Sequence, residues 1–129
     1  MKLRPAIIAC VTSIWFGGCT EASRTQQFDV VISPHREYTL IAAVIEPWFP
    51  QGPYYVSLSL QQGNAAPQLL VKTELAYDGV PFTKTNIGVR WTGDREAFAC
   101  LRATDRPDKA VQIIVEGDHT VRTTLRTGC

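Results

Sequence analysis

Residues 54–61 read Tyr-Tyr-Val-Ser-Leu-Ser-Leu-Gln, an alternation of apolar with mostly polar side chains. Successive side chains of a β-strand point to opposite faces of the sheet, so a period of two indicates a strand with one buried face. The same period recurs at residues 69–75, 86–91 and 121–126. Strands of this kind therefore set the fold class.

Two further segments, 38–45 and 111–115, are apolar at most positions on both faces, and we interpret them as central strands. Residues 95–103 are the nearest approach to a helix, but their neighbours and Cys100 suit a strand better. Turn signals separate the segments: Ser33-Pro34, Gly63-Asn64, Asp78-Gly79, Thr92-Gly93-Asp94, Arg106-Pro107-Asp108 and Gly117-Asp118. Asp78-Gly79 is the strongest hairpin signal among them.

No segment shows an apolar stripe with the 3.6-residue period of a helix. The sequence therefore predicts an all-β fold, either a small β-sandwich of immunoglobulin-like size or an open barrel, with seven to eight short antiparallel strands. The Cys-Trp-Cys arrangement of true immunoglobulin domains is absent.

The N-terminus has the features of an export signal. Lys2 and Arg4 are followed by an uncharged, mostly apolar run over 6–16. That run is too short to span a bilayer, which takes about 20 residues. The sequence Phe16-Gly17-Gly18-Cys19 resembles a bacterial lipobox, although the family usually has Leu where Phe16 stands.

The resemblance implies cleavage before Cys19 and a lipid on its thiol. The expected organisation is then a signal peptide over 1–18, the lipidated cysteine and a polar tether over 19–27, and one β domain over 28–129. Thr20 at the next position implies, by the same resemblance, a lipid-anchored protein on the periplasmic face of the outer membrane. The alternative is ordinary secretion with cleavage after Ala22.

Cys100 and Cys129 are the two cysteines left after the signal peptide and Cys19, and we predict that they form a disulfide. Metal-binding thiolates are the alternative, but His and Cys partners at ligand spacing are lacking. A plain meander would set Cys100 near Ile113 and Thr123, too far from Cys129 for a disulfide. Either the C-terminal tail folds back over the sheet or the last strand pairs elsewhere, and we favour a last strand or tail that crosses to lie beside the strand carrying Cys100.

Composition argues against nucleic-acid binding. The chain has 13 Lys and Arg against 12 Asp and Glu, and two of the cations, Lys2 and Arg4, lie in the signal peptide. Arg90, Arg122 and Arg126 belong to outward strand faces, where they either form a basic patch for an acidic partner or are solvated singly.

The sequence lacks the motifs of the common enzyme classes, and we expect neither catalysis nor a cofactor nor a metal site. The two histidines fit surface roles better than catalytic ones. His35 is expected beside Glu37 at a strand start, as a surface ion pair, and His119 is expected to be solvated in a turn. A scattered pair of carboxylates for glycoside hydrolysis is the remaining enzymatic alternative.

The segment 46–55 departs from the strand pattern because it holds three prolines and a glycine. It carries Trp48 and Phe49 and leads into Tyr54 and Tyr55, residue types that are frequent binding hot spots. Trp48 and Phe49 either cap one end of the core or form a binding surface. If they bind a partner, replacing either with Ala weakens binding without lowering the melting temperature.

We therefore expect a non-catalytic module that binds a periplasmic or envelope protein, in the manner of an inhibitor or an immunity protein, of undetermined oligomeric state. Such a role predicts one tight partner and an exposed loop. The first alternative is an accessory lipoprotein of a secretion or pilus assembly, which predicts several membrane partners and a flat apolar patch. The second alternative, a cell-wall or glycan hydrolase, predicts a pocket with converging acids.

Overall fold

The computed structural model of the chain describes residues 24–46, 53–76, 83–103 and 106–129. They form eight antiparallel strands in two four-stranded sheets, which confirms the predicted all-β fold. Sheet A contains β1 (Arg24–Ile32), β2 (Tyr38–Glu46), β3 (Tyr54–Gln62) and β4 (Gln68–Ala76). Sheet B contains β5 (Ile87–Trp91), β6 (Glu96–Leu101), β7 (Lys109–Val115) and β8 (Val121–Thr127).

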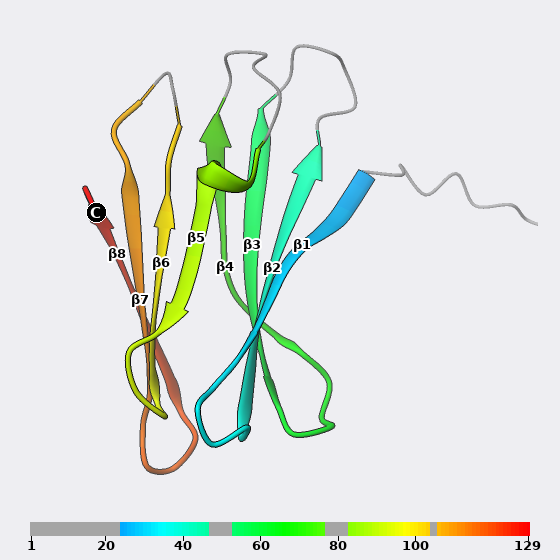
Figure 1. Ribbon diagram of the computed structural model, residues 1–129, viewed down its shortest axis with the longest axis vertical. Helices are drawn as coiled ribbons and strands as arrows, with labels where there is room; N and C mark the ends of the chain where they lie inside the picture. The colour runs from blue at the N-terminus through cyan, green and yellow to red at the C-terminus, as the bar shows by residue number, and fades with distance from the viewer. Residues whose placement is uncertain (1–23, 47–52, 77–82, 104–105) are drawn as a thin grey trace, which may run out of the picture.

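Each sheet is a meander in chain order, β1-β2-β3-β4 and then β5-β6-β7-β8. The two sheets pack face to face as a sandwich (Figure 1). The turns within the pairs β1–β2, β3–β4, β5–β6 and β7–β8 all lie at one end, which we call the hairpin end. At the other end, called the N-terminal end, β1 begins and the C-terminus lies (Figure 1).

The core lies between the sheets and consists of the alternate residues that face inward. Tyr38, Leu40, Ala42 and Val44 of β2 are all nearly inaccessible to solvent, whereas the residues between them are half-buried. Burying a large aliphatic side chain contributes about 1.5–3 kcal/mol, so this interior is the main source of stability. The rest of the core is Val56, Leu58, Leu60 and Leu75 from sheet A, and Ile87, Ala97, Ala99, Leu101, Val111, Ile113 and Val115 from sheet B.

The edge strands of sheet A are irregular. The register of β1 against β2 shifts between Gln27 and Asp29, and β4 shifts twice against β3. One of those shifts falls beside Leu75, which is 2% exposed although its strand is otherwise mostly accessible. A bulge inserts one residue and re-aims its neighbours, so the shifts adapt the edges of sheet A to the core.

The first strand begins at Arg24 rather than at Phe28, where the sequence boundary between tether and domain was expected. Polar Gln26 and Gln27 gave no strand signal of their own, and they pair with Val44 and Ala43 of β2. Cys19 lies outside the described residues, as does the Asp78-Gly79 hairpin signal.

The connection from sheet A to sheet B ends in a 3-10 turn, η1 (Lys84–Asn86). The Thr83 amide donates to the Asn86 side-chain oxygen (2.8 Å), and the Asn86 side-chain amide donates to the Arg102 carbonyl (2.8 Å). These hydrogen bonds attach the turn to Arg102, directly after β6. Across the described ranges, no helix has the length and apolar character needed to cross a bilayer.

Side chains also connect the two sheets at their margins. The Trp91 indole nitrogen of β5 donates to the Val31 carbonyl of β1 (2.9 Å). Near the N-terminal end, the Arg106 guanidinium contacts the Glu74 carboxylate (2.9 Å), and the Lys109 ammonium donates to the Glu74 carbonyl (2.8 Å). These contacts fix the lateral position of one sheet on the other.

Candidate functional site

The aromatic residues that the sequence singles out do not form one surface among the described residues. Trp48 and Phe49 lie outside them. Tyr54 packs against the core, whereas Tyr55 lies on the outer face of β3, with the Lys72 ammonium 5.3 Å from its ring centre. Adjacent strand residues point to opposite faces, so the two tyrosines serve different surfaces.

Tyr54 lines a hollow of about 500 Å³ at the N-terminal end of the sandwich. Phe28 and Val44 complete its apolar wall. Its polar lining consists of Gln26, Gln27, Glu46, Thr83 and Lys84. Glu46 is the one carboxylate among the described lining residues, which otherwise offer hydrogen bonds and apolar contact.

Within the described part of the chain, the outer face of sheet A leaves several apolar side chains exposed. Val30 and Ile32 of β1 are 41% and 54% exposed, and Leu69 of β4 is 58% exposed. Cross-strand pairing places Val30, Ile41, Ser59 and Leu69 in one row across all four strands. We call this surface the aliphatic face, and its members are Val30, Ile32, Ile41, Ala43, Ile45, Tyr55 and Leu69.

The aliphatic face is poor in charge. Lys72 and Glu74 of β4 form its charged margin. The small side chains of Ser57 and Ser59 on β3 lie near its centre. This surface was not predicted, although the sequence contains a signal for it. Residues 38–45 are apolar on both faces, which correctly predicted a central strand and also means that the outer side of β2 is apolar.

The structure contains the predicted disulfide between Cys100 and Cys129, with a Cα–Cα distance of 5.8 Å. The expectation that a plain meander excludes it is wrong, because the predicted register is wrong. Cys100 lies opposite Ala110, and Ala110 lies opposite Arg126, so Cys100 and Arg126 share one row of sheet B. The short tail after β8 therefore spans only the distance that remains between that row and Cys100. The tail folds back, as one of the two alternatives proposed.

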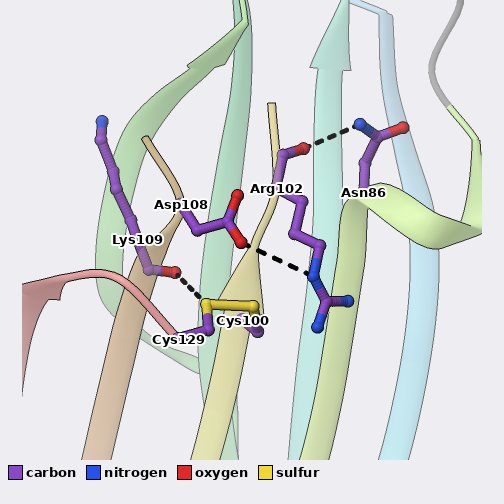
Figure 2. The surroundings of a disulfide bond; sticks show 6 residues. All are labelled: Asn86, Cys100, Arg102, Asp108, Lys109 and Cys129. Carbon is purple, nitrogen blue, oxygen red and sulfur yellow. Dashed lines mark hydrogen bonds and ion pairs between the residues drawn. A yellow bond between two sulfur atoms is a disulfide. The ribbon is translucent and has the colours of Figure 1, made fainter. Parts of the chain in front are cut away.

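The surroundings of the disulfide explain that path (Figure 2). Gly128 has a positive φ of 86°, a conformation that favours glycine, and its amide donates to the Asp108 carbonyl (2.6 Å). The Cys129 sulfur lies 3.4 Å from the Lys109 carbonyl oxygen. A disulfide sulfur carries no proton, so this is a contact rather than a hydrogen bond.

Cys100, Cys129 and Asp108 bring two sulfurs and a carboxylate within 4.8 Å of one another. The sulfurs are bonded to each other, and metal ligation by cysteine needs a free thiolate. The Asp108 carboxylate instead lies 3.7 Å from Arg102 Nε (Figure 2). In its oxidised form this cluster is therefore structural.

Both histidines lie at the hairpin end, and each connects the two sheets. His35 does not pair with Glu37 as expected, because both belong to the turn before β2 rather than to a strand. Its Nδ1 lies 2.6 Å from the Asp94 carboxylate, in the β5–β6 turn. His119 is 45% exposed, and its Nδ1 lies 2.5 Å from the Tyr38 hydroxyl.

Two ionisable groups near His119 have shifted pKa values. Burial raises the pKa of the Tyr38 hydroxyl, and the neighbouring Glu37 carboxylate adds to this increase. The Thr120 backbone amide donates to the Asp118 carboxylate (3.1 Å) and holds the pKa of that carboxyl below its usual value. These shifts follow from the local geometry of the β7–β8 turn and the start of β2.

Arg90, Arg122 and Arg126 are exposed on the outer face of sheet B, as predicted. Arg122 lies 3.5 Å from the Glu116 carboxylate, and Arg126 donates to the Gln112 side-chain oxygen (3.3 Å). The other three arginines of the C-terminal half contact separate groups: Arg95 the Glu116 carbonyl, Arg102 the Asp108 carboxylate and Arg106 the Glu74 carboxylate.

Comparisons with protein-family models, with curated proteins and with solved structures find no match to this chain. The candidate site therefore rests on geometry alone. Of the surfaces described, the aliphatic face is the broadest and carries the most exposed apolar side chains.

Proposed function

We propose that this protein is a lipid-anchored, non-catalytic binding module of the bacterial envelope, and that it binds a protein partner through the aliphatic face. The observation that carries the proposal is the exposure of Val30, Ile32 and Leu69 on the outer face of sheet A, as the described residues show it. Several exposed apolar side chains gathered on one face of a sheet are a feature of protein interaction sites.

The dimensions of sheet A suit this role. A strand of nine residues is about 30 Å long, and four strands span about 15 Å, which gives on the order of 450 Å². This is the area of the whole outer face, which the apolar residues of the aliphatic face share with Ser57, Ser59, Lys72 and Glu74. A partner that also contacts the polar margin would reach the area of a specific interface.

Anchoring through Cys19 is the second part of the proposal. It is supported by the basic start, the apolar run and the two glycines before Cys19. Because β1 begins at Arg24, the residues between them reach at most about 18 Å. The domain would then stay close to the outer membrane, with its N-terminal end toward the lipid.

The aliphatic face favours an accessory role in an envelope protein assembly over an inhibitor role. A flat apolar surface suits a lasting contact with another flat surface, because such interfaces resemble a domain core cut in half. An inhibitor that inserts a loop into a cleft would depend instead on Trp48 and Phe49. The two roles therefore predict different sensitive residues.

The test is co-purification of the tagged full-length chain from envelope membranes after cross-linking in cells. We compare the double variant Ile32→Glu, Leu69→Glu with Arg90→Glu, a control because Arg90 is exposed on the outer face of sheet B. Exposed substitutions typically change the free energy of unfolding by about 0.5 kcal/mol or less, so folding should be retained.

We expect several membrane proteins to co-purify, and the double variant alone to lose them. A single partner that is lost only when Trp48 and Phe49 become Ala would establish the inhibitor role instead. Retention of every partner by the double variant would refute the aliphatic face as the binding surface. Metabolic labelling with a fatty acid tests the anchor, since Cys19→Ala should abolish the label.

A further inference from the structure

The backbone of β8 has an open edge whose hydrogen-bonding groups can be assigned from the β7–β8 ladder. The Glu116 amide donates to Thr120, and the Gly128 amide donates to Asp108. Both hydrogen bonds join residues that are directly opposite in the β7–β8 register. In an antiparallel ladder, hydrogen-bonded pairs alternate with non-hydrogen-bonded pairs. Every second residue of β8, counted from Thr120, therefore bonds to β7. The residues whose amides and carbonyls point away from β7 are therefore Val121, Thr123, Leu125 and Thr127.

The other three sheet edges are less suited to accept a strand. β1 is interrupted by the shift between Gln27 and Asp29, and β4 by two shifts. β5 is short, and its Trp91 indole is bonded to the Val31 carbonyl of β1. Bulges, short length and cover are the usual means by which edges are protected from pairing.

Among the described residues, β8 is neither short nor bulged, and it approaches sheet A mainly at its margin with β4. Its seven residues pair with β7 without a register shift, and they include no proline. Its sequence, Val-Arg-Thr-Thr-Leu-Arg-Thr, is rich in residues that favour strands. The disulfide at Cys129 and the hydrogen bond from the Gly128 amide to Asp108 hold its C-terminal end in place.

The charge of β8 indicates which kind of strand would pair with it. Arg122 and Arg126 point to the outer face and are both exposed, with Thr124 between them. Arg126 donates to the neutral Gln112, and Arg122 contacts the partly exposed Glu116 carboxylate at 3.5 Å. Carboxylates on an added strand, directly opposite these arginines, would form cross-strand ion pairs.

We propose that the open edge of β8 binds an extended, acidic segment of a protein partner, which adds to sheet B as a further strand. The backbone groups of Val121, Thr123, Leu125 and Thr127 would bind the main chain, and Arg122 and Arg126 would select for alternate acidic residues. A second copy of this chain fits poorly, because pairing two β8 strands along their full length sets Arg122 opposite Arg126.

This edge is separate from the aliphatic face, so either proposal can fail without the other.

The probe is a synthetic peptide of the length of β8, with two glutamates four residues apart in a background of threonine and valine. The matched control peptide has lysine in place of both glutamates. Binding to the full-length chain in detergent is measured by calorimetry, and amide hydrogen exchange locates the site.

We expect the acidic peptide to bind, to protect the outward amides of β8 and to lose affinity as salt is added. The variant Arg122→Glu, Arg126→Glu should bind it at least about tenfold more weakly and should bind the lysine peptide instead. Arg90→Glu on β5 is the matched control and should leave both affinities unchanged.

A proline scan separates edge pairing from simple charge attraction. The Thr123 amide points to the open edge, so Thr123→Pro keeps the β7 ladder and should abolish peptide binding. The Thr124 amide points to β7, so Thr124→Pro should unfold or destabilise sheet B. Unchanged peptide binding by folded Thr123→Pro overturns the proposal, as does equal binding of the acidic and lysine peptides or no binding of either.

Discussion

Tyr38 connects the interior of sheet A to the last hairpin of sheet B. Tyr38 is 1% exposed. Its hydroxyl nevertheless contacts His119, whose side chain is partly accessible to solvent. Its ring also lies 6.4 Å from the Trp91 ring, and the Trp91 indole is bonded to β1. A buried tyrosine normally needs a partner for its hydroxyl, and the β7–β8 turn supplies one.

The raised pKa of Tyr38 makes stability depend on pH in the alkaline range. The folded chain retains the hydroxyl proton at pH values where the unfolded chain, with a pKa near 10.0, has released it. The Tyr38 contribution is therefore constant below that pH, and it falls as pH rises toward the folded-state pKa.

We expect Tyr38→Phe to lower the free energy of unfolding by about 1 kcal/mol at neutral pH, because the hydrogen bond to His119 is lost. The deficit should shrink above pH 10, where wild type loses stability at Tyr38 and the variant does not. Urea titrations at pH 7 and at alkaline pH measure both effects. A constant difference across that range would contradict the assignment.

At the scale of one element, β8 is held less by burial than by its ends. All seven of its residues are exposed or half-buried, and Val121 packs against the core. The disulfide and the Gly128 amide fix its C-terminal end, and the β7–β8 turn with His119 fixes its start. A strand with so little core contact depends strongly on these attachments.

The double variant Cys100→Ala, Cys129→Ala tests that dependence. The disulfide separates its cysteines by 29 residues, and closing such a loop in the unfolded chain corresponds to about 3–4 kcal/mol of stability. We expect a loss of this size in urea unfolding and faster hydrogen exchange in β8 than in β2. Equal exchange rates in the two strands would show that the disulfide does not hold β8.

Across the whole molecule, the two sheets depend on one shared core. Each sheet alone would expose an apolar inner face, and contacts at both ends of the sandwich tie the sheets together. His35 with Asp94 and Tyr38 with His119 act at the hairpin end, while Arg106 with Glu74 acts near the other end. Two sheets connected in this way should unfold as a single cooperative unit.

We expect Leu58→Ala, in the centre of sheet A, to lower the free energy of unfolding by about 2–5 kcal/mol because it leaves a cavity. Hydrogen exchange should rise together in β3 and in β7 of the other sheet. Exchange that rises in sheet A alone would show that the sheets unfold separately.

Much of the fold follows from the sequence because the strand period is a local property. Every predicted strand segment, including residues 95–103 with their helix-like alanines, has its counterpart among the eight strands. The pairing of Cys100 with Cys129 could also be predicted, since counting cysteines does not require a register. The β1 boundary was missed because Gln26 and Gln27 are strand residues only by virtue of pairing with β2.

The tertiary structure alone decided which surfaces remain uncovered and how distant residues meet. The registers of β6 with β7 and of β7 with β8 place Cys100 in the same row as Arg126, and this brings Cys129 within bonding distance of Cys100. That register depends on the length of the 102–108 connection. Packing sheet B against one side of β2 left Ile41 and Ile45 on the other side as part of the aliphatic face. The alternation of side chains along a strand assigns each residue to one of two faces. Only the packing of a second sheet determines which of these faces is buried.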